Sequence, residues 1–277
     1  MNNLIKRALT GILFVVILGG SILYSSYSFL VIFSIITVAG LWEFYSLIEN
    51  AGKASFDKAI HCFGGFLLLI AFFMFASTNF GLSVFLPYVF YFLYLFISRL
   101  YLKEEDPVQN WAYILMGQIY VALPFGLLCF LPFEHVGDTI NYRQVFPFSF
   151  FLFLWINDTG AYIVGSTFGK HKMFKRISPK KSWEGFTGGV ILAIITAFMF
   201  SYYFPAMLNL SEWIGMALVT VIFGTWGDLT ESLFKRTINV KDSGNILPGH
   251  GGILDRFDSA LLAAPACVIY FAMLNLF

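Results

Sequence analysis

The polar stretch Trp226–Asp258, WGDLTESLFKRTINVKDSGNILPGHGGILDRFD, separates two apolar runs, Gly215–Thr225 and Ser259–Phe277. It contains five acids, four bases, one histidine and several glycines. Carboxylates bind Mg²⁺ together with substrate phosphates, lysine and arginine bind phosphate oxygens, and glycines let the backbone approach a ligand closely. A short loop of this kind beside membrane helices therefore predicts a site for a metal ion and phosphates.

The composition of the whole chain is that of a polytopic membrane protein. Of its 277 residues, 58% are hydrophobic and 12% are charged, and the mean hydropathy is +0.77, whereas soluble domains carry about 25% charged residues. The three cysteines have neither disulfide nor zinc spacing and are expected to be buried or lipid-facing. No Walker A, GxSxG or Rossmann pattern occurs, which argues against an ATPase, a lipase-type hydrolase and a redox enzyme.

Hydropathy predicts an all-α fold with about nine transmembrane helices, since a span needs about 20 apolar residues. The third and fourth of these spans, Ile60–Ala76 and Phe80–Ile97, could instead form one re-entrant hairpin. The N-terminal apolar run is interpreted as a retained span rather than a cleaved signal peptide. The predicted spans are Ala8–Tyr24, Ser28–Ile48, Ile60–Ala76, Phe80–Ile97, Trp111–Pro132, Phe146–Phe168, Gly185–Phe204, Ser211–Leu233 and Ser259–Phe277.

The distribution of bases supports this number of spans. With nine spans, sixteen of the seventeen lysines and arginines fall on one side of the membrane, and Arg143 alone falls on the other. The positive-inside rule then places the N-terminus in the cytoplasm and the C-terminus outside. We expect residues 1–145 to form an N-terminal region of about five spans. Residues 146–277 would form a catalytic region of about four, with cytoplasmic loops 169–184 and 235–257.

Five short stretches of the sequence together resemble the signature of phosphatidate cytidylyltransferases, also called CDP-diacylglycerol synthases. The resemblance rests on Ser232–Arg236, Lys241–Gly244, Leu247–Asp258, Asn157–Tyr162 and Ser178–Gly185. It implies transfer of the cytidylyl group of CTP to phosphatidate in phospholipid biosynthesis, with CDP-diacylglycerol and pyrophosphate as products. It also implies dependence on Mg²⁺, with a second cation left open. A bacterial inner-membrane location is expected from the compact chain, which shows no soluble appendage. No nucleic-acid partner is expected, and a homodimer is left open.

Acids near the ends of the spans are the candidate metal ligands. We expect Asp228 and Asp255 to approach each other and to share the Mg²⁺ site, with Ser232 and Asp258 in supporting roles. Asp255 follows the glycine-rich turn and need not cap a helix. The alternatives are a buried ion pair for Asp228 and an N-terminal cap of the last helix for Asp258.

The bases of the last polar stretch and of the earlier loop, 169–184, are candidate phosphate ligands. In the last polar stretch these are Lys235 and Arg236, together with Lys241 and Arg256, although each alone could be a positive-inside anchor. In the earlier segment, Lys180, Lys181 and Ser182 are interpreted as a clamp for a nucleotide or lipid phosphate, with Glu184 capping and orienting it. Of the other bases there, Lys170, Lys172 and Lys175 are explained by attraction to anionic lipid.

Four further polar or small features carry weaker expectations. His250 could bind phosphate or orient an acid, or simply be solvated. Asp158, inside a span, is either a substrate-binding carboxylate or a partner in helix–helix hydrogen bonding. Glu43 lies outside the resemblance and is expected to be a structural or interfacial acid. The pair Gly188–Gly189 is expected to permit close helix packing.

Two other functional classes remain open from the sequence. One is a CTP-dependent lipid kinase, or a cytidylyltransferase with another lipid acceptor. The other is a membrane transporter, which would also carry intramembrane acids. Transporters place their sites near the bilayer midplane, and the charged motifs gathered at one membrane face count against that class.

Overall fold

The structure is a computed structural model that describes residues 3–55, 57–101, 106–137, 139–244 and 251–276. These residues form two compact units. Unit 1 comprises the described residues of 1–144 and 242–256, and unit 2 comprises residues 145–241 and 257–276. The expected division of the chain into two membrane regions at residue 145 stays a prediction.

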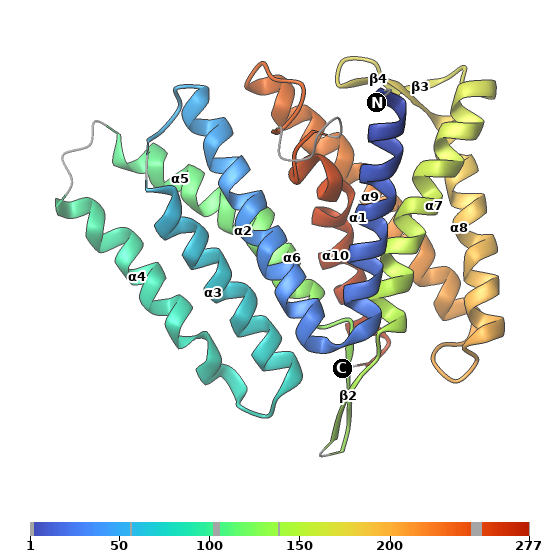
Figure 1. Cartoon of the computed structure of the whole chain (residues 1–277), viewed down its shortest axis with the longest axis horizontal. Coiled ribbons are helices and arrows are strands. Elements are labelled where there is room, and N and C mark those ends of the chain that lie inside the picture. Colours follow the sequence, from blue (N-terminus) through green and yellow to red (C-terminus); the bar gives the residue numbers. More distant parts are fainter. Residues whose placement is uncertain (1–2, 56, 102–105, 138, 245–250, 277) are drawn as a thin grey trace. The chain divides into compact units, whose positions relative to one another are not determined.

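Unit 1 is built mainly from helices, of which α2, α3 and α4 lie side by side (Figure 1). A short two-stranded antiparallel sheet, β1–β2, follows the helices. Its elements are α1 (Asn3–Tyr24), α2 (Ser26–Asn50), α3 (Lys58–Ser77), the 3₁₀ helix η1 (Gly81–Phe85), α4 (Leu86–Tyr101), α5 (Pro107–Gly117), the π-helical turn η2 (Gln118–Ala122), α6 (Leu123–Leu128), β1 (Phe133–Val136) and β2 (Thr139–Tyr142).

Local sequence explains where the helices of unit 1 begin. Ser25 caps α2 in a reciprocal capping box with Ser28. Asp57 caps α3 by accepting from two backbone amides, and Asp106 caps α5 just before a proline in its first turn. The rings of Phe29 and Phe33, both in α2, pack in the core, so α2 combines a polar start with an apolar buried face.

One of the sixteen bases counted on the cytoplasmic side, Arg99, is buried. Arg99, in the last turn of α4, lies 3.2 Å from the ring of His61 in α3. The other ring nitrogen of His61 lies 3.0 Å from the Tyr91 hydroxyl. Arg99 therefore links α3 and α4 rather than facing a lipid headgroup, because buried polar groups are paired inside the protein.

Unit 2 consists of four helices and a hairpin. Its elements are α7 (Val145–Phe168), β3 (Lys172–Phe174), β4 (Ser178–Ser182), α8 (Trp183–Tyr203), α9 (Leu210–Thr237) and the greater part of α10 (Leu254–Met273), which begins in unit 1. Helices α7 and α8 run alongside each other (Figure 1). A Cβ on Gly160 would lie 2.9 Å from the carbonyl oxygen of Gly188 and 3.0 Å from the Cα of Gly189. The predicted close packing at Gly188–Gly189 is confirmed.

The prediction of an all-α integral membrane protein is confirmed. Among the described residues, eight helices are long and apolar enough to span a membrane, and Thr10–Tyr24 of α1 is a shorter apolar helix. Helix α3 has 20 residues, and the segment Gly81–Tyr101, which comprises η1 and α4, has 21. Each is long enough to span a membrane by itself, which favours two spans over one re-entrant hairpin. The predicted buried or lipid-facing cysteines are all free and buried.

Two details of the predicted loops need correction. The segment 169–184 contains the β3–β4 hairpin, and helix α9 continues to Thr237. Lys235 and Arg236 therefore lie in the last helical turn instead of in a loop. Hydropathy marks the end of the apolar run, but the residues that follow are good helix formers and extend the helix beyond it.

Candidate functional site

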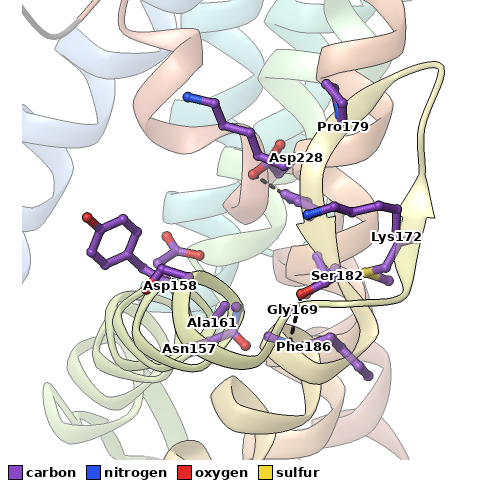
Figure 2. A pocket seen from close by; sticks show the side chains of 17 residues that line it. Asn157, Asp158, Ala161, Gly169, Lys172, Pro179, Ser182, Phe186 and Asp228 are labelled. Atoms are coloured by element: carbon purple, nitrogen blue, oxygen red, sulfur yellow. Dashed lines mark hydrogen bonds and ion pairs between the residues drawn. The ribbon is translucent and has the colours of Figure 1, made fainter.

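A cavity of about 630 Å³ lies in unit 2, beside α7, the start of α8 and α9, with the β3–β4 hairpin at its edge (Figure 2). Its volume is in the range typical of small-molecule sites. It is lined by Asn157, Asp158, Ala161, Tyr162, Gly165, Ser166, Gly169, Lys172, Met173, Pro179, Lys180, Lys181, Ser182, Gly185, Phe186, Thr225 and Asp228.

The β3–β4 hairpin carries the lysines of the cavity and is fixed at both ends. Lys172 pairs with Ser182 across the two strands. The carboxylate of Glu184 accepts from the His171 backbone amide at 3.1 Å and contacts the His171 ring. The ring of Phe174 packs edge-on against Trp226 of α9. These contacts confirm that Glu184 orients the segment.

The start of α8 forms one wall of the cavity. Ser182 is the N-cap, and its hydroxyl accepts from the Gly185 amide at 3.2 Å. Gly185 must be small, because a Cβ there would lie 2.8 Å from the carbonyl oxygen of Ala161 in α7. The positive end of a helix dipole at this wall favours a bound anion.

Two carboxylates, from different helices, face the same cavity as the lysines (Figure 2). Asp158 comes from α7, and Asp228 comes from α9. The ammonium of Lys181 lies 2.6 Å from Asp228 Oδ2, with both side chains about a quarter exposed. The hydroxyl of Ser232 donates to Asp228 Oδ1 at 3.3 Å. The described lining thus combines three lysines with two aspartates.

More acids lie near Asp228 in unit 2. Glu231 is 1% exposed and forms an ion pair with Lys235, one helical turn along α9, at 2.5 Å. Asp258 of α10 interacts electrostatically with Asp228 and Glu231, and also with Asp158. Among the described residues, however, no group of three or more His, Cys, Asp or Glu side chains is arranged to hold a metal ion by itself.

Comparison with known proteins fits this arrangement of charges. The sequence profile of the Cytidylyltransferase family matches residues 5–274. The chain belongs to the cytidylyltransferase family. It is 32% identical over 277 residues to the phosphatidate cytidylyltransferase of Bacillus subtilis, covering 99% of this chain and 98% of that protein.

Other relatives within the cytidylyltransferase family match over a shorter region. The phosphatidate cytidylyltransferase of Staphylococcus aureus is 43% identical over 163 residues, and that of Staphylococcus saprophyticus is 44% identical over 166 residues. Each match covers 59% of this chain and 60% of the relative. The chain thus matches less than two thirds of the length of these staphylococcal proteins.

The second predicted acid of this cytidylyltransferase-family chain, Asp255, belongs to unit 1. Its Oδ2 atom accepts from the backbone amides of Ser243 and Gly252, both at 2.9 Å. Both amides precede α10, so Asp255 holds backbone outside the helix in which it lies. Asp228 belongs to unit 2, and the predicted approach of Asp228 and Asp255 stays a prediction.

Asp258 does not begin the last helix as expected. Helix α10 starts at Leu254, so Asp255 lies in its first turn and Asp258 lies one turn further on. The N-terminal capping alternative for Asp258 is thereby excluded. A Cβ on Gly227 would lie 2.5 Å from the Asp258 carbonyl oxygen, so α9 and α10 pack closely beside Asp228.

The bases of the last polar stretch are placed differently from Lys180 and Lys181. Lys235 is in the ion pair with Glu231, and Arg236 is exposed and donates to the Val240 carbonyl at 3.5 Å. Neither is among the described residues that line the cavity. Lys241 and Arg256 are exposed, and His250 lies outside the described residues. Their phosphate-binding roles stay predictions.

Sequence reasoning missed several residues of the cavity and its surroundings. Lys172 was assigned to lipid attraction, but its strand pairing with Ser182 brings it to the cavity wall. Asn157 and Tyr162 also line the cavity; both belong to the resemblance, which was the available signal.

Proposed function

We propose that this chain transfers the cytidylyl group of CTP to phosphatidate. An oxygen of the phosphatidate phosphate attacks the α-phosphorus of CTP, the new P–O bond forms, and the bond to the β-phosphate oxygen breaks. The products are CDP-diacylglycerol and pyrophosphate. Because the attacking phosphate is already anionic, the reaction requires no strong general base. The main requirement is to bring two anions together and to stabilise the leaving pyrophosphate.

The observation that carries this proposal is the mixed charge of the cavity in unit 2. Lys172, Lys180 and Lys181 meet Asp158 and Asp228 beside the start of α8. Lysines and a helix N-terminus suit phosphate oxygens. Carboxylates in the same cavity suit a cation that accompanies a triphosphate. The names of the relatives supply the acceptor and the nucleotide base.

Mg²⁺ is the cation that we propose for this site. It keeps several waters and binds through one or two carboxylates together with substrate phosphates. The Lys181 ammonium against Asp228 shows that this carboxylate accommodates a positive charge. Asp228 would hold the ion, with Asp255 as the second ligand predicted from the sequence, and Asp158 lines the same cavity as Asp228. The ion would supply charge neutralisation at the phosphates.

The membrane gives each substrate its own route in this proposal. Phosphatidate stays in the leaflet and enters between helices, and CTP arrives from the cytoplasm. The charge asymmetry of the loops supports a cytoplasmic N-terminus and cytoplasmic site. The bacterial relatives support an inner-membrane location.

The experiment uses the full chain in detergent with phosphatidate, Mg²⁺ and CTP labelled at the α-phosphate. We expect label to enter the lipid fraction, to be absent when EDTA removes Mg²⁺, and to be lost in Asp228→Asn. Glu134→Gln, in the β1–β2 hairpin, is the control and should retain activity. Label that enters the lipid equally in Asp228→Asn would refute the site.

CTP labelled at the γ-phosphate separates the proposed reaction from that of a lipid kinase. Cytidylyl transfer leaves the γ-phosphate in pyrophosphate, whereas a kinase moves it to the lipid. Lipid labelled only from γ-labelled CTP would overturn the proposal in favour of the kinase.

A further inference from the structure

Glu43 is a buried acid in the membrane helix α2, 5% exposed. Its neighbour Trp42 is 46% exposed, so Glu43 lies on the inward face of the helix. Buried acids in membrane spans are costly and are usually held by specific partners. Within unit 1, those partners lie about 200 residues further along the chain.

Both described ends of the signature loop, which we define as residues 242–256, bind the same carboxylate oxygen. Glu43 Oε2 accepts from the Ser243 hydroxyl at 3.2 Å and from the Leu254 backbone amide at 3.0 Å. Leu254 is the first residue of α10, and the first amides of a helix lack partners within it. Glu43 therefore caps α10 from another helix.

A second layer of hydrogen bonds connects Glu43 to Asp255. The Ser243 hydroxyl, which donates to Glu43, accepts from the Asp255 amide at 3.3 Å. The Asp255 carboxylate in turn accepts from the Ser243 amide. Glu43 thus fixes the residue that binds Asp255 through both its backbone and its side chain.

Gly244 provides independent support for this arrangement. A Cβ on Gly244 would lie 2.6 Å from Glu43 Oε1, and its three nearest atoms all belong to Glu43. A Cβ on Gly252 would likewise meet Ser243 Oγ and Glu43 Oε2. We expected the glycines of this loop to admit a ligand. Gly244 and Gly252 instead make room for Glu43 and its hydrogen-bonding partner.

We propose that Glu43 is a positioning residue, which holds the two described ends of the signature loop together and so orients the Asp255 carboxylate. Its role in catalysis rests on the proposed function, in which Asp255 helps to bind Mg²⁺. Residues that orient a metal ligand typically contribute 10–100-fold to metal affinity or activity. Removing Glu43 should therefore raise the Mg²⁺ concentration for half-maximal activity by about tenfold or more.

The test compares Glu43→Ala, Glu43→Gln and Thr37→Val in the full chain. Gln retains an oxygen that can accept both hydrogen bonds, so Glu43→Gln should rescue most of the loss. Thr37 lies six residues earlier on α2 and is fully buried, and its hydroxyl has no hydrogen-bond partner among the described residues. Thr37→Val should therefore leave the Mg²⁺ requirement unchanged. An unchanged Mg²⁺ requirement in folded Glu43→Ala would overturn the proposal.

Hydrogen exchange measures the same contact without enzyme activity. Peptides that contain the Ser243 or Leu254 amide should exchange faster in Glu43→Ala, while peptides from unit 2 stay unchanged. If the wild type shows no cytidylyl transfer but this difference appears, the proposed function fails and the role of Glu43 in the loop stands. Equal exchange in Glu43→Ala and wild type would overturn that role.

A double-mutant cycle with Gly244→Ala decides whether the contact is direct. In the wild-type background Gly244→Ala should raise the Mg²⁺ requirement, because the new methyl group displaces Glu43. In the Glu43→Ala background the same substitution should add little, since the atoms it would meet are gone. Equal effects in both backgrounds would show that Gly244 acts independently of Glu43 and would contradict the proposed contact.

Discussion

The ion pair between Lys181 and Asp228 allows a sharp test of the proposed site, because a structural and a functional pair differ in magnitude. The two charged atoms lie 2.6 Å apart, and Coulomb's law at an effective dielectric constant of about 20 gives roughly 6 kcal/mol of attraction. Desolvation and side-chain entropy oppose it, and both groups are about a quarter exposed. Partly exposed pairs contribute roughly 1 kcal/mol or less to stability.

Lys181→Met and Asp228→Asn should therefore each lower the melting temperature by only a few degrees. Their effect on cytidylyl transfer should be far larger. Groups aimed at charge that develops in a transition state contribute about 100–1000-fold to kcat. We expect losses of that order in the α-labelled CTP assay for each variant, measured per folded molecule. The double variant should lose less than the product of the two, because both residues act on one set of phosphates.

Lys58 and Glu49 form a matched control pair in unit 1. Their charged atoms are 2.8 Å apart, and their side chains are 24% and 23% exposed. Lys58→Met and Glu49→Gln should change the melting temperature by a similar amount but leave turnover intact. If the Lys181 and Asp228 variants lose no more turnover than this control pair, the placement of Lys181 and Asp228 in the catalytic site is wrong.

Three other predictions concern the frame that holds the cavity. Ser182→Ala removes the N-cap of α8 and should cost about 1 kcal/mol of stability, measured by thermal unfolding; an unchanged melting temperature would contradict the cap. Gly189→Ala places a Cβ 2.8 Å from a backbone oxygen of α7, and overpacking of this kind costs about 1–3 kcal/mol. Gly20→Ala, with nothing within 4 Å of the new Cβ, should not lower the melting temperature. Glu184→Gln weakens the contact with His171 that holds the β3–β4 hairpin, so the KM for CTP should rise more than kcat falls; a loss confined to kcat would exclude this role.

The helices could be predicted from the sequence because each apolar run has the length of a membrane span. Their ends were harder to place. Helix α9 passes the end of its apolar run and carries Lys235 and Arg236 in its last turn. Hydropathy reports where lipid ends, whereas a helix ends where its backbone groups find other partners.

The cavity could be predicted in part. The resemblance includes Asp158, Lys180 and Lys181, and Asp228 was a candidate as an acid near the end of a span. Unit 2 brings these four residues to one cavity. Lys172 was missed because a strand pairing brings it to the wall, and the segment shows little of the alternation that marks a strand. The contact of Glu43 with Gly244 joins residues about 200 positions apart, which spacing along one sequence cannot reveal.

The arrangement of charges in unit 2 reconciles two opposing requirements of the proposed reaction. Lysines that attract phosphates would repel one another in a cavity without an anion, and acids that hold a cation would repel the phosphates. Pairing Lys181 with Asp228 satisfies both charges before substrate arrives, since an unpaired charge away from water is costly. A triphosphate and its cation supply the opposite charge to each group. In the proposed reaction, the same ion pair would therefore provide one group for the nucleotide phosphates and one for the metal ion.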